Sequence, residues 1–160
     1  MLQVRLVCTG RMKERFYIDA FNEYAKRLSA YCRFECVELP EIKLPENPSI
    51  KETEAALKKE AAAMERNIPR DALRVAMCVE GRQQTSEEFA RLLSDRALSG
   101  RPSLCFLIGS SFGLDEEFKN SADMRLSLSA MTFPHHLARV MLAEQIYRGF
   151  KIGEGSRYHK

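Results

Sequence analysis

Apolar and polar residues follow two different periods along this chain, and the order of these periods predicts its elements. Five short segments have the alternating or continuously apolar pattern of β-strands, namely 2–8, 32–39, 72–79, 103–108 and 125–131. Five others have the spacing of helices, namely 12–30, 50–67, 85–98, a short stretch within 109–124, and 135–151. Strand and helix therefore alternate five times, which predicts an α/β fold with a mainly parallel sheet and helices on both faces.

Residues with strong local preferences support individual elements. Ser49 is followed three positions later by Glu52, which is the spacing of a reciprocal capping box at a helix start. Thr85 is a second residue of the type that caps helices. The segment 103–108 is the most continuously apolar strand, and such strands are usually covered on both faces.

Length and composition limit the class of protein. The chain has 160 residues, of which 45% are hydrophobic and 29% charged, an ordinary mixture for a globular protein. We expect one domain over 1–160 that ends in a short tail, about 153–160. No apolar run approaches the ~18–20 residues of a membrane span, and the N-terminal segment is too short and interrupted for a secretory signal. We therefore expect a cytoplasmic protein with no membrane partner.

The cysteines indicate the same compartment. Their number is odd, and each lies in a predicted strand: Cys8, Cys32, Cys36, Cys78 and Cys105. Buried, reduced thiols fit this pattern better than a disulfide framework does. Cys32 and Cys36 are the only close pair, and no second pair or nearby histidine completes a zinc set. We therefore expect no metal site.

The net charge of +3 is concentrated at one end of the chain. Residues 135–160 contain five basic residues against two acidic ones, whereas residues 1–134 contain 20 of each. All three histidines also lie in the last stretch. Two interpretations stay open: a helix with a ragged basic end, or a site for an anionic partner.

Three segments connect a predicted strand to the next helix, and each is expected at the carboxyl edge of the sheet, where open α/β sheets bind ligands. They cover 80–88, 109–117 and 129–136. In the second segment, Gly109 and Gly113 flank a Ser-Ser-Phe turn, and glycine allows a ligand to approach the backbone closely.

The type of ligand is limited by what the glycine-containing segment lacks. It has no Lys-Ser/Thr ending and no G-x-G-x-x-G pattern, so it is neither a Walker phosphate loop nor a dinucleotide-binding loop. Asp115, Glu116 and Glu117 follow directly and would repel phosphate. An uncharged or cationic adenosine ligand is therefore favoured over ATP.

Several residues near the C-terminus could take part in chemistry, and each also has a plainer interpretation. Histidines at a helix start, here His135 and His136, are more often surface or capping residues. Glu144 and Arg148 have the i, i+4 spacing of a surface ion pair, and a wide apolar stripe on the same helix places them at a possible interface rim. The tail usually frays unless something orders it.

Longer segments carry a more specific signal. These are FLIGSSFGL, LSLSAMTFPHHLARVMLAEQIYRGFKI and the terminal YHK, together with the opening VRLVCTGRMKERFYIDAFNEYAKRL and the connection LPENPS. They resemble the rRNA large subunit methyltransferase H (RlmH) family of the SPOUT superfamily. The resemblance covers essentially the whole chain.

This resemblance implies a specific fold and activity. It implies an α/β-knot, in which the C-terminal part threads a trefoil knot, and a homodimer with two S-adenosylmethionine sites. The implied reaction is methylation at N3 of a pseudouridine in 23S rRNA, the large-subunit rRNA, on the assembled ribosome.

The resemblance also implies roles for individual residues. The family's cofactor-binding positions correspond to Met77, Gly109, Leu128, Ser129, Ala130, Met131, Thr132 and Phe133. Its catalytic, substrate-side positions correspond to Arg148, Tyr158 and His159, with Glu144 close by. The chain departs from the family pattern at Ser110, where glycine is frequent, at Cys78, where an acidic residue is frequent, and at Arg157, where a small residue or proline is usual.

These positions suggest a mechanism. We expect Arg148 to stabilise the anion left when N3 loses its proton, because that charge is delocalised onto the neighbouring carbonyls. We expect His159 to accept the proton or to position the base, and Tyr158 to stack on the base or hydrogen-bond to it. The tail is expected to complete the site of the other protomer.

Two other classes of protein compete with this interpretation. A non-catalytic ribosome-binding or assembly factor needs the basic C-terminus but not the cofactor loops, and the presence of both in this chain disfavours that class. A flavodoxin-like nucleotide-binding enzyme is disfavoured by the acidic cluster 115–117 and the missing phosphate motifs.

Overall fold

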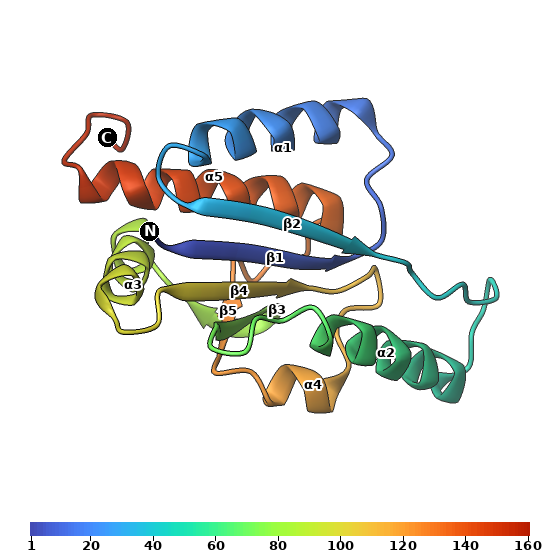
Figure 1. Ribbon diagram of the computed structural model, residues 1–160. Helices are drawn as coiled ribbons and strands as arrows, with labels where there is room; N and C mark the ends of the chain where they lie inside the picture. The colour runs from blue at the N-terminus through green and yellow to red at the C-terminus, as the bar shows by residue number, and fades with distance from the viewer.

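Five parallel strands form one sheet in the computed structural model, which describes residues 1–160 (Figure 1). The strand order is β2-β1-β4-β3-β5. The strands are β1 (Gln3–Thr9), β2 (Arg33–Leu39), β3 (Leu73–Gln83), β4 (Ser103–Ile108) and β5 (Met124–Ser127). The helices are α1 (Arg15–Leu28), α2 (Ile50–Glu65), α3 (Ser86–Leu98), α4 (Glu116–Asn120) and α5 (His135–Gly153). The predicted fivefold alternation and the parallel sheet are confirmed.

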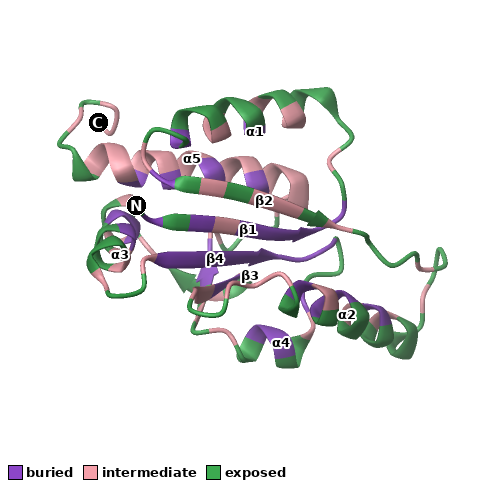
Figure 2. Ribbon diagram, in the orientation of Figure 1, coloured by how far each residue is buried: buried purple, intermediate pink, exposed green.

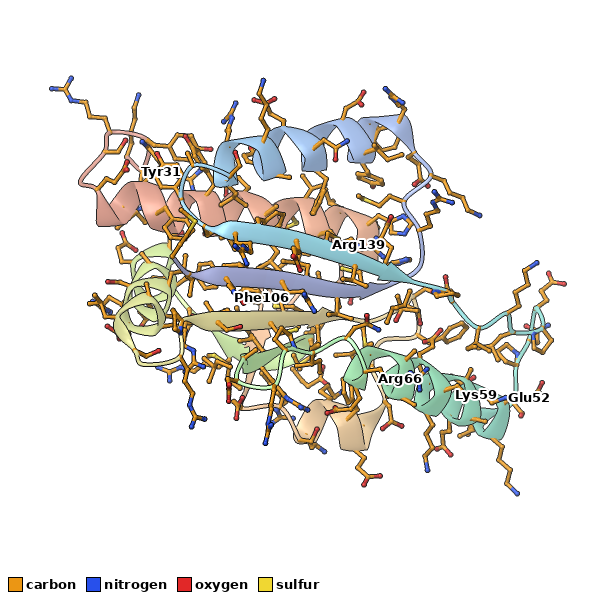
Figure 3. The ribbon with its side chains drawn as sticks, in the orientation of Figure 1. Tyr31, Glu52, Lys59, Arg66, Phe106 and Arg139 are labelled. Atoms are coloured by element: carbon orange, nitrogen blue, oxygen red, sulfur yellow. The ribbon has the colours of Figure 1, made fainter.

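Helices cover both faces of the sheet, as the pattern predicted. One apolar cluster joins the sheet to α1, α3 and α5, and a second joins its other face to α2 and α4 (Figure 1). All six residues of β4 are buried between these layers, and Figure 2 shows the buried positions concentrated on the central strands. In Figure 3, Phe106 lies in the sheet, whereas Glu52, Lys59 and Arg66 are exposed along α2.

Both predicted helix caps are present. The Ser49 hydroxyl accepts a hydrogen bond from the Glu52 backbone N–H at 3.1 Å, and the Glu52 carboxylate accepts one from the Ser49 N–H at 3.1 Å. Thr85 forms the same reciprocal pair with Glu88. Each capping box pairs backbone N–H groups that the start of a helix otherwise leaves without an acceptor. The two boxes therefore stabilise the first turns of α2 and α3.

Several predicted strand boundaries are wrong. The third strand was expected to end at residue 79 but continues to Gln83, because Arg82 and Gln83 still pair with β5. The last strand was expected over 125–131 but ends at Ser127, because side chains take over the hydrogen bonding that a ladder needs. The Ser127 hydroxyl donates to the Ser129 carbonyl at 2.8 Å, and the Ser129 hydroxyl accepts from the Met131 N–H at 3.1 Å. Cys32 lies one residue before β2 rather than within it.

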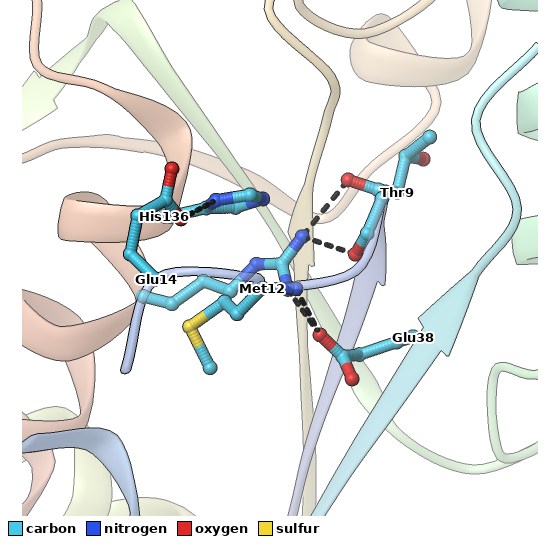
Figure 4. Close-up of polar contacts among 7 residues, drawn as sticks. Thr9, Met12, Glu14, Glu38 and His136 are labelled. Atoms are coloured by element: carbon cyan, nitrogen blue, oxygen red, sulfur yellow. Dashed lines mark hydrogen bonds and ion pairs between the residues drawn. The ribbon is translucent and has the colours of Figure 1, made fainter. Parts of the chain in front are cut away.

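One buried cation ties the sheet to α5. The Arg139 side chain is fully buried and donates to the backbone carbonyls of Thr9 at 2.9 Å and Gly10 at 2.7 Å (Figure 4). It also pairs with the Glu38 carboxylate at 2.8 Å. Arg139 thus joins the ends of β1 and β2 to the first turns of α5.

No helix is long and apolar enough to cross a bilayer. All five cysteines are free.

Candidate cofactor pocket and substrate-side cluster

A cavity of about 1210 Å³ opens at the carboxyl ends of β3, β4 and β5. Its walls come from residues 77–80 of β3, just beyond the part of β3 that pairs with β4, and from the β4–α4 and β5–α5 loops, with a few residues of α2. Two of the three predicted segments, 109–117 and 129–136, therefore meet here. The first predicted segment, 80–88, begins within β3, and only its residue Glu80 reaches this cavity.

The β4–α4 loop folds tightly because it contains two glycines. A Cβ atom at Gly109 would lie 2.2 Å from the Gly113 carbonyl oxygen, so no larger residue fits without moving the loop. Gly113 has φ +85°, which favours glycine. Ser110 pairs with Gly113 in an isolated bridge and is itself buried, so serine is accommodated where the family often has glycine.

The β5–α5 loop supplies a second wall. Nearly all of the cofactor-binding positions predicted in this loop line the cavity: Leu128, Ser129, Met131, Thr132 and Phe133. Ala130 is not among the lining residues. Exposed apolar side chains gather around the opening, since Met131 is 72% exposed and both Phe112 and Val79 are also exposed. A planar apolar group of a ligand would be sheltered from water here.

The lining carries an excess of negative charge. Five carboxylates and two lysines face the cavity, which gives a formal charge of −3: Glu54, Glu80, Asp115, Glu116 and Glu117 against Lys58 and Lys119. Lys119 is already paired with Glu80 and Glu116. Burial lowers the pKa of His135 to about 4, and the nearby charges of His136 and Arg139 act in the same direction, so this imidazole adds no charge at neutral pH. The cavity thus favours a cationic ligand over a phosphate.

The predicted substrate-side residues form a separate cluster. The Glu144 carboxylate accepts hydrogen bonds from Arg148 at 2.5 Å and from the Tyr158 hydroxyl at 3.2 Å. Arg148 lies 4.9 Å from the Tyr158 ring centroid and 3.3 Å from His159 Nδ1. The tail is therefore packed against α5 rather than frayed. Burial and the Glu144 charge raise the pKa of Tyr158 to about 12, so its hydroxyl stays protonated.

The cavity lies at the first turn of α5, whereas the cluster lies along the second half of this helix. This helix begins beside the cavity at His135 and runs back along the sheet to the chain terminus (Figure 1). Arg148 is thirteen residues further along, which corresponds to about 20 Å of helix. One protomer by itself does not bring the two predicted groups of site residues together.

A smaller cavity of about 530 Å³ lies between α1, α3, α5 and the end of β5. It shares Leu126 and Leu128 with the larger one and reaches Glu144 of the cluster. The remainder of the first predicted segment lies here, at Gln84, Thr85 and Ser86.

Contacts within the chain neutralise much of the basic C-terminus. Arg139 is buried against Glu38, Arg148 is paired with Glu144, and Lys151 is paired with Glu154. Only Arg157 and Lys160 of the five basic residues have no ion pair. The interpretation of this segment as a broad anionic-partner site is therefore weakened.

Some residues at the two sites could not be singled out from the sequence. Glu87 holds His159, and Gln145 holds Glu144, yet both look like ordinary surface positions in the sequence. His136 contacts Glu14 at 3.4 Å (Figure 4), and its side chain is only 15% exposed and makes no helix cap, so the surface or capping interpretation is wrong for it. Its neighbour His135 lines the cavity. No group of three or more His, Cys, Asp or Glu side chains is placed to hold a metal ion.

Fold and site together define an α/β methyltransferase. A family model described as "Predicted SPOUT methyltransferase" matches residues 2–159, and the chain belongs to this family. It is 43% identical to "Ribosomal RNA large subunit methyltransferase H" of Clostridioides difficile (strain 630) over 159 residues, which are 99% of this chain and 100% of the relative. The protein of that name from Streptococcus pyogenes serotype M5 (strain Manfredo) is 41% identical with the same coverage. The resemblance to the RlmH family is confirmed.

A more distant solved structure also matches. It is the SpoU methyltransferase AviRb from Streptomyces viridochromogenes in complex with AdoMet, with 14% identity and a TM-score of 0.46. The match covers 98% of this chain and 59% of that one.

Proposed function

We propose that this protein transfers a methyl group from S-adenosylmethionine to N3 of a pseudouridine in 23S rRNA, on the assembled ribosome in the cytoplasm. The observation that carries the proposal is the anionic, apolar-walled cavity at the carboxyl edge of the sheet, in a chain of the SPOUT methyltransferase family. The names of the relatives support rRNA as the substrate class.

The residues around the cavity fit this cofactor. When bound, S-adenosylmethionine supplies a methyl group activated by a positively charged sulfur, and the lining charge of −3 suits that cation. Gly109 lets its loop close on Gly113, and this closed loop forms one wall of the cavity. We assign binding to Met77, Gly109 and the loop 128–133, in which backbone groups would hold the adenosine.

The cluster at the chain terminus fits the nucleotide side of the reaction. Removing the N3 proton leaves a negative charge shared with two carbonyl oxygens, and the guanidinium of Arg148 would stabilise it. Glu144 fixes the direction of that guanidinium, and Tyr158 packs on it. His159 remains either the proton acceptor or a residue that positions the base.

Composition also favours the assembled particle over naked RNA. The net charge is +3, and most of the cations near the cluster are already paired. Each phosphate contact contributes a salt dependence of about 0.7–0.9 in log–log slope, so few free cations imply weak binding to RNA alone. Recognition by shape then carries more weight.

The separation of cavity and cluster along α5 supports a shared active site. We propose a knotted single domain over 1–160 that forms a homodimer, in which the tail 153–160 of one protomer completes the cavity of the other. Two equal sites follow from a twofold axis.

Co-expression of two defective chains tests the shared site. One chain lacks 153–160 and the other carries Gly109→Ala, so each alone should be inactive. Heterodimers form half of the random dimers and contain one intact site of two, so about one quarter of the activity should return. Each chain co-expressed with itself is the control, and an inactive mixture that contains heterodimers would count against sharing.

The reaction itself is tested by mass spectrometry of 23S rRNA from a strain that lacks this gene. Add-back of the protein should restore a single N3-methylated pseudouridine, and add-back of Arg148→Ala should not. Titration calorimetry separates the alternatives, because an assembly factor binds no S-adenosylmethionine and a flavodoxin-like enzyme binds a phosphorylated nucleotide instead. Methylation at a different atom or base would refute the assigned substrate.

A further inference from the structure

We propose that Glu87, in the first turn of α3, is a positioning residue for methyl transfer that holds the His159 ring against Arg148; this inference rests on the proposed function above. Glu87 is 72 positions away from His159 in the sequence, and the fold of the tail brings the two together. Figure 1 shows the chain terminus and α3 at the same end of the molecule.

The contacts fix the orientation of the imidazole. Arg148 Nη1 lies 3.3 Å from His159 Nδ1, and a guanidinium only donates hydrogen bonds, so Nδ1 has to be the acceptor. The ring proton is then on Nε2, which lies 2.9 Å from the Glu87 carboxylate. A backbone hydrogen bond lowers the pKa of the Glu87 carboxyl most, and the hydrogen bond from His159 lowers it further. The acceptor therefore stays ionised. Glu87 thereby selects both the tautomer and the angle of the ring.

The residue next to Glu87 supports the same cluster from its other side. The Ser86 hydroxyl donates to the Gln145 side-chain oxygen at 2.9 Å, and the Gln145 amide donates to Glu144 at 2.8 Å. Successive residues of one helical turn therefore hold both partners of the Glu144–Arg148 ion pair.

This turn is suited to the task because it is rigid. The capping box of Thr85 and Glu88 satisfies its backbone, and Phe89 anchors it in the core. A guanidinium held between Glu144 and His159 has little freedom left, which is what a group that must meet a developing charge requires.

Two substitutions at Glu87 separate geometry from charge. Glu87→Ala removes the acceptor for Nε2–H, and the single-turnover methylation rate should fall about tenfold, the usual scale for losing one charged hydrogen bond. Glu87→Gln keeps an acceptor oxygen and should restore most of that rate. Affinity for S-adenosylmethionine should be unchanged in both variants, because Glu87 does not line the cofactor cavity and acts through His159 on the nucleotide side of the reaction. Asp95→Asn removes an exposed, unpaired charge from the same helix and is the matched control.

The contact has a second readout that needs no activity. The chain has only three histidines, so ¹⁵N-labelled histidine gives three resolvable rings. Long-range ¹H–¹⁵N spectra should place the His159 proton on Nε2 in the unaltered chain and in Asp95→Asn, and should show tautomer averaging in Glu87→Ala.

The outcomes are distinguishable. If Glu87→Ala matches Asp95→Asn in rate, or if its His159 signals do not change, the inference is overturned. If the unaltered chain transfers no methyl group, the proposed function falls together with the role of Glu87 in it, and the spectra still decide whether Glu87 holds the ring.

Discussion

Gly109→Ala should raise the Kd for S-adenosylmethionine at least a hundredfold, which corresponds to about 2.7 kcal/mol of binding free energy. The added methyl group would lie 2.2 Å from the Gly113 carbonyl oxygen and 2.4 Å from its carbon, both of them backbone atoms. Because backbone cannot rotate aside as a side chain does, the whole β4–α4 loop has to move. Its movement displaces one wall of the cofactor cavity.

Titration calorimetry measures this effect, and Gly100→Ala is the matched control, since a Cβ at Gly100 meets nothing within 4 Å. Circular dichroism should show a folded protein in both cases, because the loop lies outside the sheet. A Gly109→Ala chain that binds the cofactor within threefold of the unaltered affinity would show that this loop does not shape the site.

Arg139→Ala should lower the free energy of unfolding by about 3–5 kcal/mol, the range for breaking a buried ion pair. The substitution leaves the carbonyls of Thr9 and Gly10 without their donor and Glu38 without its counter-ion. It also leaves a cavity where a fully buried long side chain had been. Arg139→Lys keeps the charge but cannot reach three acceptors in the same way, so it should be intermediate.

Urea denaturation gives the comparison, with Arg91→Ala as the control. Arg91 is exposed on α3 and has no ion pair, so its loss should change stability by less than about 0.5 kcal/mol. A loss below about 1 kcal/mol in Arg139→Ala would mean that Arg139 is not what joins α5 to the sheet.

The spacing of apolar residues was sufficient to predict the strands and helices, because each of them buries one face or both. The apolar run at 103–108 became the fully buried central strand, and the boxes at Ser49 and Thr85 start their helices where expected. The end of β5 could not be found this way, since the alternation of 125–131 continues past Ser127 into a loop that serine side chains hold.

The cofactor cavity was predictable to the extent that it is made of local segments. Loops that follow strands lie at one edge of a parallel sheet, so the order of strands and helices along the chain is enough to place 109–117 and 129–136 at the same edge. The burial of a charged side chain could not be predicted in this way. Arg139 looks like one more cation in a basic stretch, and only the closure of β1 and β2 around it shows otherwise.

The substrate-side cluster depended on family resemblance rather than on pattern. Nothing local in the sequence relates Glu87 to His159 or Ser86 to Gln145, because each contact joins segments that meet only after α3 and α5 have packed together.

The uninterrupted course of α5 from His135 to Gly153 constrains how this family can evolve. Adding or removing a single residue inside that rod would turn everything beyond it by about 100° and shift it by about 1.5 Å. The terminal residues would then point away from whichever partner they serve. We therefore expect insertions and deletions in the connections around the sheet, such as 40–49, and none between these two residues.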